Sequence, residues 1–195
     1  PAGGGLRQGR QQPEQCARGM LRRFDVRAVC TTDDPADDLQ WHRQCAGEDL
    51  QMGVYPTFRP DKALAVHQPE AWNAWCDRLS ALSGVEVGNY AALLQALRKR
   101  HDDFHAIGGR LSDHGLNHCH ATFVSEAEAE RIFAKARAGQ AATPEEQDAF
   151  ASNIMLEVGR MNAEKGWTMQ LHLGPLRNNN TRLARQIGAD VGCDS

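Results

Sequence analysis

Apolar and polar residues alternate over residues 168–173, which predicts a β-strand that runs into a polar turn. Thr168, Gln170 and His172 share one face of a strand with a period of two, and the apolar residues 169, 171 and 173 share the other. Gly174-Pro175 then ends the strand. The pattern places His172 at a strand end among polar neighbours, although a lone histidine in a strand is more often a satisfied core residue.

Two earlier segments repeat this order of a β-type run followed by polar residues. Residues 26–31 form a short β-type run that leads into the polar turn 32–35, where a helix can begin. Residues 50–58 form a second run, followed by the polar residues 59–62 and a helical stretch over 70–82. These two segments therefore predict two βα units.

The middle of the chain has a helical period. Residues 89–104 place Leu93, Leu94 and Leu97 on one side of an amphipathic helix. The basic run Arg98-Lys99-Arg100 lies outside this apolar stripe, and we expect it to face water.

Two later helices have clear N-terminal signals. Ser125 with Glu128 predicts a capping box, and Thr143 predicts a second helix cap with Glu146 three residues on. The strand over 168–173 follows the second helix directly. Strands that alternate with helices favour a parallel α/β architecture, which gathers polar residues at the strand ends.

Composition narrows the function classes. The 195 residues carry a formal net charge of −3, so no overall field favours nucleic acid or an anionic membrane. The six cysteines form no Cys-x-x-Cys pair and are typical of reduced thiols in a cytoplasmic protein. No apolar run approaches the length of a membrane span. Residues 1–12 contain one aliphatic side chain, Leu6, and we expect this N-terminal segment to be poorly ordered.

Four polar clusters are expected to meet at one end of the sheet, and each has a structural alternative. The clusters are Asp33 with Asp34, Arg59 with Asp61 and Lys62, Asp113 with His114, and His172 with Arg177. The Asp33-Asp34-Pro35 run is more typical of a turn and helix cap than of a catalytic pair. Arg59 is either a surface residue or a residue whose guanidinium binds a carboxylate with two hydrogen bonds. Asp113-His114 is either a dyad or a turn residue beside a solvated histidine.

Histidine spacing also suggests a metal site. His114, His118 and His120, with Cys119 between the last two, have the spacing of metal ligands. Such a spacing arises easily by chance in a chain with eight histidines. We therefore do not assign a metal to these residues.

Taken together, these motifs resemble uronate isomerase, also called glucuronate isomerase, of the amidohydrolase superfamily. The resemblance covers about residues 13–195. It rests on motifs whose order and spacing are similar to those of the family: Thr31-Thr32-Asp33-Asp34-Pro35, Arg59-Pro60-Asp61-Lys62-Ala63, Ser112-Asp113-His114, Gln170-x-His172-x-Gly174, Leu176-Arg177-Asn178-Asn179-Asn180 and Gly192-x-Asp194-Ser195.

The resemblance implies a fold and a reaction. The fold is an α/β fold, part of a distorted (β/α)8 TIM-type barrel with additional helices, incomplete at both ends. The reaction is the aldose-ketose isomerisation of a hexuronate, D-glucuronate to D-fructuronate or D-galacturonate to D-tagaturonate. By analogy, Asp113 and His172 are the catalytic residues, and Arg59, His114 and Arg177 bind substrate. A homo-oligomer is compatible with this interpretation.

The chain also departs from the family pattern. The resemblance implies a divalent metal, with zinc favoured, held by a His-x-His pair on the first strand and an aspartate on the last. Neither motif is present here, so we predict no metal ligand in this chain, a middle segment of the barrel, and no activity of the segment alone. The alternatives are a metal-dependent hydrolase of the amidohydrolase type and an inactive truncated fragment.

Overall fold

The computed structural model describes residues 16–48, 50–174 and 178–188. Strands and helices alternate along this part of the chain. In order, the elements are α2 (Ala17–Arg23), β1 (Ala28–Asp33), α3 (Gln40–Ala46), β2 (Gly53–Phe58), the 3-10 helix η2 (Asp61–Leu64), α4 (Pro69–Ser83), α5 (Tyr90–Ala106), β3 (Leu111–Leu116), α6 (Glu126–Arg137), α7 (Pro144–Lys165), β4 (Thr168–Leu173) and α8 (Thr181–Ile187). The predicted α/β class is confirmed.

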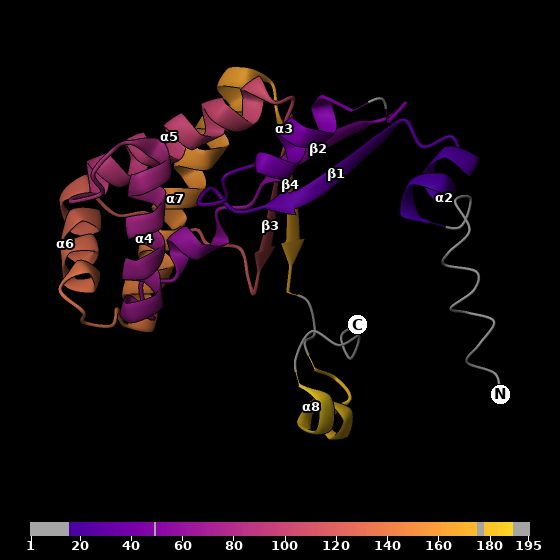
Figure 1. The fold of residues 1–195 in the computed structure, drawn as a ribbon. Coiled ribbons are helices and arrows are strands. Elements are labelled where there is room, and N and C mark those ends of the chain that lie inside the picture. Colours follow the sequence, from indigo (N-terminus) through magenta and orange to yellow (C-terminus); the bar gives the residue numbers. More distant parts are fainter. Residues whose placement is uncertain (1–15, 49, 175–177, 189–195) are drawn as a thin grey trace.

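The four strands form one parallel sheet in the order β1-β2-β3-β4. β1 pairs with β2 along its whole length, and β3 pairs with β4 in the same way. Between β2 and β3 there is a single register pair, Phe58 with Ser112. The sheet is therefore two ribbons joined at one point, and Figure 1 shows the ribbons diverging from this joint.

The strand over Thr168–Leu173 was predicted with the observed bounds. β1 begins and ends two residues later than predicted and includes Asp33. Its backbone pairing with β2 continues to the pair Asp33 with Phe58, whereas side-chain polarity suggested that the strand ended earlier.

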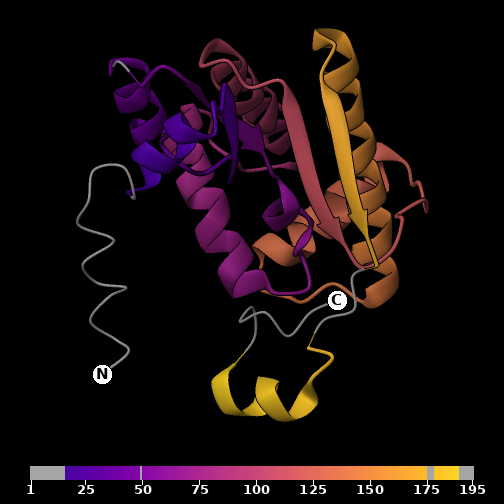
Figure 2. The same cartoon turned by 90° about the vertical axis from the view of Figure 1, so that its right-hand side faces the viewer.

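Helices α4 to α7 form a layer against one side of the sheet (Figures 1 and 2). The core lies within this layer and under the strands, and aromatic rings fill much of it. Trp72 packs edge to face against Phe133 and Phe150, and Phe58 packs in the same way against Phe104. In both views α8 lies apart from this body.

Arg100 does not face water as predicted. Its side chain is buried, and its guanidinium donates hydrogen bonds to the carbonyl oxygens of Pro35 (2.8 Å) and Asp37 (2.7 Å). Arg98 on the same helix stays partly exposed and pairs with Glu164. Arg100 thus holds the loop after β1 against α5, a contact between distant segments that the helical pattern does not reveal.

One of the two predicted helix caps is complete. Thr143 and Glu146 form a reciprocal capping box at the start of α7. Ser125 accepts a hydrogen bond from the Glu128 N–H, but the Glu128 carboxylate binds Arg131 instead of returning to the cap. The predicted capping box at α6 is therefore only half formed.

Apolar side chains are exposed along β4, which is an edge strand of the described sheet. Leu171 and Leu173 keep 45% and 49% of their surface exposed, and Phe123 and Leu156 are also exposed. Met169, two residues before Leu171 on the same face of the strand, packs against the core. The alternation predicted for this strand is present, with its distal apolar end uncovered.

Three other predictions bear on the chain as a whole. In the described part of the chain, no helix is both long and apolar enough to cross a lipid bilayer. No disulfide joins the five cysteines of the described residues, and the sixth, Cys193, lies outside them. Residues 1–12, predicted to be poorly ordered, lie outside the described residues.

Candidate active site

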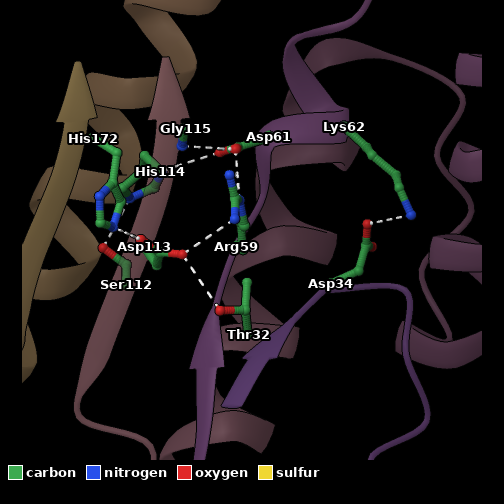
Figure 3. Close-up of polar contacts among 10 residues, drawn as sticks. All are labelled: Thr32, Asp34, Arg59, Asp61, Lys62, Ser112, Asp113, His114, Gly115 and His172. Atoms are coloured by element: carbon green, nitrogen blue, oxygen red, sulfur yellow. Dashed lines mark hydrogen bonds and ion pairs between the residues drawn. The ribbon is translucent and has the colours of Figure 1, made fainter. Parts of the chain in front are cut away.

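Polar side chains gather at the edge of the sheet toward which the carboxyl ends of β2, β3 and β4 point. Arg59 directly follows β2, Asp113 lies on β3 and His172 lies on β4. Figure 3 shows Asp113 between Arg59 and His172. Parallel α/β proteins bind ligands at this edge, and the structure brings these three predicted residues together there.

Asp113 is the centre of the cluster. Its Oδ1 lies 2.7 Å from Nε2 of His172, and its Oδ2 lies 3.4 Å from Nη1 of Arg59. Thr32 of β1 donates a long hydrogen bond of 3.5 Å to the same Oδ2. The side chain is only 9% exposed, so both oxygens face protein groups and not bulk water. One buried carboxylate thus links β1, β2, β3 and β4.

Arg59 is held by a second carboxylate, Asp61. Nε of Arg59 donates to Oδ2 of Asp61 at 2.8 Å, and the Gly115 N–H donates to the same oxygen at 2.9 Å. The hydrogen bond to Asp61 raises the pKa of Arg59 above its ordinary value, partly opposed by burial. The guanidinium is therefore a permanent cation, and a third of the side chain remains exposed.

Asp61 stays ionised although it is largely buried. Burial alone would raise the pKa of its carboxyl, but contacts with His114 and Arg59 and the hydrogen bond from Gly115 together hold the pKa below its ordinary value. The 3-10 helix η2 begins at Asp61 and fixes its position directly after Arg59. Asp61 was expected in this cluster, but its bond to the β3 backbone could not be read from the sequence.

His114 lies behind the site and not in it. Its ring has no exposed surface, its Nε2 lies 2.9 Å from Oγ of Ser112, and its Nδ1 lies 3.6 Å from Oδ1 of Asp61. Ser112 also accepts a hydrogen bond from Asn162 of α7 at 2.7 Å. The substrate contact of His114 stays a prediction, and in the described residues its Nδ1 faces the Asp61 carboxylate.

His172 is the accessible member of the cluster. Its side chain is 64% exposed, in contrast to Asp113 beside it. The default expectation of a satisfied core histidine is therefore wrong for His172. Arg177, predicted to bind substrate, lies outside the described residues.

Asp33 and Asp34 hold the fold next to this cluster. Asp34 accepts hydrogen bonds from the Trp75 indole and the Ala36 N–H, both at 2.7 Å, and pairs with Lys62 at 3.0 Å. Asp33 accepts a hydrogen bond of 2.6 Å from Thr31. These contacts agree with the turn alternative for the Asp-Asp-Pro run and leave neither carboxylate free for a catalytic pair.

The described residues of this cluster do not form a metal site by themselves. Asp113 and His172 supply two adjacent donor atoms, but no third histidine, cysteine or carboxylate donor in the described ranges converges with them. A metal at this position would need ligands from other parts of a barrel. The described residues include one set of three converging donors, His118 and His120 in the segment after β3 and Asp148 on α7.

Four parallel strands, their connecting helices and the polar groups at one edge define a parallel α/β protein with a polar cluster at the strand ends, where proteins of this class bind ligands. A family model described as glucuronate isomerase matches residues 6–195. The chain therefore belongs to the glucuronate isomerase, or uronate isomerase, family.

Curated relatives share high sequence identity over most of this chain. The uronate isomerase of Solibacter usitatus is 57% identical over 183 residues, which cover 94% of this chain and 39% of the relative. The uronate isomerase of Opitutus terrae is 55% identical over 176 residues, which cover 90% of this chain and 37% of the relative. The chain thus spans less than two fifths of the length of these relatives.

Solved structures agree with this assignment. The crystal structure of uronate isomerase from Thermotoga maritima matches with a TM-score of 0.82 at 32% identity, over 91% of this chain and 39% of that one. Glucuronate isomerase from Caulobacter crescentus matches with the same TM-score at 29% identity, over 94% and 38%. The chain therefore corresponds to part of a TIM-type barrel, as predicted.

Proposed function

We propose that residues 13–195 form the central portion of a uronate isomerase barrel in a longer protein. That protein interconverts an aldose hexuronate and its ketose form, D-glucuronate with D-fructuronate or D-galacturonate with D-tagaturonate. This reaction makes it an intramolecular oxidoreductase. The family assignment and the polar cluster at the strand ends support the proposal.

One observation carries the proposal at the level of chemistry. The Asp113 carboxylate contacts an exposed imidazole with one oxygen and a fixed cation with the other. Aldose-ketose isomerisation moves a proton between C2 and C1, so it needs a proton carrier beside a group that binds the charged substrate. In this proposal His172 is the proton carrier and Arg59 is the group that binds the charged substrate, and the two lie on opposite sides of Asp113.

The roles follow from exposure and charge. His172 is the accessible group, so its imidazole takes the proton from C2 of the substrate and returns it to C1, while the proton of the C2 hydroxyl moves to the carbonyl oxygen at C1. Asp113 is buried and lies between Arg59 and His172, so it orients the imidazole and stabilises the imidazolium that forms. Arg59 binds the uronate carboxylate, which a guanidinium can hold with two parallel hydrogen bonds. Arg177 is proposed as a further substrate-binding residue.

The proposal includes a divalent metal, with zinc favoured, in the whole protein. Since the described residues of the cluster provide no complete ligand set, that metal would be held mainly by other parts of the barrel, and none of the steps above depends on it. We also propose a cytoplasmic location, which the free thiols support, a hexuronate as the small-molecule partner, and self-association as a homo-oligomer.

The activity is tested by comparing the longer protein with the 195-residue chain. Each is incubated with a free hexuronate and, separately, with a uronate lactone, and products are separated by chromatography. We expect the longer protein to convert the aldose to the ketose and the 195-residue chain to show no turnover. Hydrolysis of the lactone without isomerisation of the free acid would replace the proposal with a metal-dependent hydrolase.

A further inference from the structure

A histidine pair and an aspartate converge in the segment between β3 and α6. His118 Nε2 lies 2.8 Å and His120 Nδ1 lies 2.7 Å from the same oxygen, Oδ1 of Asp148 on α7. The three donor atoms lie within 4.8 Å of one another. This cluster is not part of the Asp113 site, and the proposed isomerisation does not use it.

The cluster is built on a rigid support. His118 and His120, two residues apart in the segment after β3, both face Asp148, and their ring centroids are 4.4 Å apart. Ser152 accepts a hydrogen bond of 2.8 Å from the Thr122 N–H, and Asn153 both donates to and accepts from the backbone of Val124. The histidines are therefore held over α7 by contacts that do not involve the histidines themselves.

The charge at the cluster favours a cation. The Asp148 carboxylate directs one oxygen at both imidazoles, so the cluster combines a carboxylate with two nitrogen donors. The cluster opens into a hollow of about 250 Å³ that is also lined by the ionised Asp61. Two carboxylates and three imidazoles, those of His67, His118 and His120, thus face the same space.

We propose that His118, His120 and Asp148 bind a divalent transition-metal ion, with zinc as the best-fitting ion. Imidazole with carboxylate is a ligand set that zinc accepts, whereas calcium and magnesium prefer oxygen ligands alone. Zinc at about 2.0–2.1 Å from each ligand separates neighbouring donor atoms by roughly 3.3 Å. The observed separations of 2.7 and 2.8 Å need to widen by only about half an ångström, and the exposed His118 ring is free of the core.

The site has three protein ligands, which leaves a tetrahedral ion with one position open toward the hollow. A bound ion would also join the segment after β3 to α7, because two of its ligands lie in that segment and the third on the helix. Binding should therefore stabilise the folded chain in proportion to the free zinc concentration. This inference does not depend on the isomerase function.

Zinc binding is tested directly on the 195-residue chain, in which the metal motifs of the first and last barrel strands are absent. The chain is dialysed against buffered free zinc, the bound zinc is measured by elemental analysis, and the affinity by competition with a chromophoric chelator. We expect one zinc ion per chain with a dissociation constant at or below the micromolar range. The unfolding temperature should rise in the same zinc buffer.

Variants separate this cluster from other zinc-binding groups. His118→Ala and Asp148→Asn should each weaken binding by about tenfold or more, and His118 is exposed enough that its removal does not disturb the core. Two matched controls should bind zinc as the unmodified chain does: His67→Ala, which removes another imidazole from the same hollow, and Cys119→Ser, which removes the neighbouring thiol.

Cobalt(II) reports the ligand type. Cobalt bound by imidazole and carboxylate should give visible absorption without the intense near-ultraviolet band of a thiolate ligand. The proposal is overturned if the unmodified chain retains no zinc at micromolar free concentrations. It is equally overturned if His118→Ala and Asp148→Asn bind zinc unchanged, or if Cys119→Ser alone abolishes binding. In each of those cases Asp148 serves only as a hydrogen-bond acceptor that joins the two histidines.

Discussion

Oδ1 of Asp113 lies 2.7 Å from Nε2 of His172, so a buried carboxylate on β3 is paired with an exposed imidazole on β4. The two residues are not directly opposite in the ladder, because Asp113 aligns with Gln170 and His172 with Gly115. Their side chains meet diagonally across neighbouring strands. The exposed ring therefore lies within ion-pair distance of the buried carboxylate.

Asp113→Asn should slow the isomerase without unfolding it. The amide keeps the shape of the side chain but loses the negative charge that orients His172 and stabilises its protonated form. We expect kcat of the longer protein to fall by about 10² to 10⁴ with a smaller change in KM. Steady-state kinetics of the variant measure both constants. Asp102→Asn is the matched control, since Asp102 is an exposed partner of Lys165 on α5 and its variant should keep full activity.

Arg59→Ala should weaken substrate binding in the longer protein. The change removes the cation proposed to hold the uronate carboxylate, so we expect KM to rise by about tenfold or more. Lys165→Ala removes a cation of α7 that lies outside the cluster and should leave KM unchanged. An Arg59→Ala protein with unaltered kcat and KM would show that Arg59 does not bind the substrate.

Gly115→Ala tests the placement of Arg59 by a different route. A Cβ atom at Gly115 would lie 2.2 Å from Nη2 of Arg59, and the end of this flexible side chain must therefore move. We expect a higher KM with a change in the free energy of unfolding below about 1 kcal/mol. Gly159→Ala is the control, because its Cβ meets no atom within 4 Å. If Gly115→Ala unfolds the protein instead, the close approach is a requirement of the fold.

Arg100→Met should destabilise the chain strongly. The variant leaves the carbonyl oxygens of Pro35 and Asp37 without their buried donor, at a cost of about 2–4 kcal/mol. Arg98→Met, two residues earlier on the same helix, removes only a partly exposed ion pair and should cost less than about 1 kcal/mol. Urea unfolding of the two variants at one pH gives both values. Equal effects would show that Arg100 contributes no more than a surface residue.

Stability should fall as the solution is acidified through the range set by His101. Burial lowers the pKa of this imidazole to about 4, while the unfolded chain titrates near 6.5. The unfolded state therefore takes up a proton first, and this favours unfolding by up to about 3 kcal/mol as the pH falls from 6.5 to 4. Above pH 6.5 the contribution is constant.

His101→Gln isolates this effect. Glutamine can still donate to Asn162, which now lies 3.0 Å from Nε2 of His101, but it does not titrate. Urea unfolding at several pH values should show a weaker loss of stability between pH 6.5 and 4 in the variant. His67→Gln, which changes an imidazole outside this buried contact, should follow the unmodified chain. The idea fails if His101→Gln and the unmodified chain lose stability in parallel.

Local patterns were sufficient for much of the fold. The alternation over residues 168–173 gave the bounds of β4, and Thr143 with Glu146 marked the start of α7, because both features are set by neighbours in sequence. Arg100 could not be placed in this way. Its partners Pro35 and Asp37 lie more than 60 residues away, and a basic run at the edge of an apolar stripe looks the same whether it is solvated or buried.

The candidate sites, too, could be predicted from the sequence only in part. Arg59, Asp113 and His172 were predicted to meet because each lies at or near a strand end, and the structure brings them together. The burial of His114 was not foreseen, since a polar residue in a strand gives no sign of which face is covered. Asp148 was missed as a partner of His118 and His120. It follows His120 by 28 residues on a separate helix, and no local signal connects them.

A charged side chain lies at the seam where the two ribbons of the sheet meet. Where β2 has ended and β3 continues, the Gly115 N–H has no strand carbonyl beside it, and the Asp61 carboxylate accepts its hydrogen bond in place of one. The same carboxylate holds Arg59. One carboxylate oxygen thus joins the candidate site to the seam between the ribbons, because it accepts from the Arg59 side chain and from the Gly115 backbone alike.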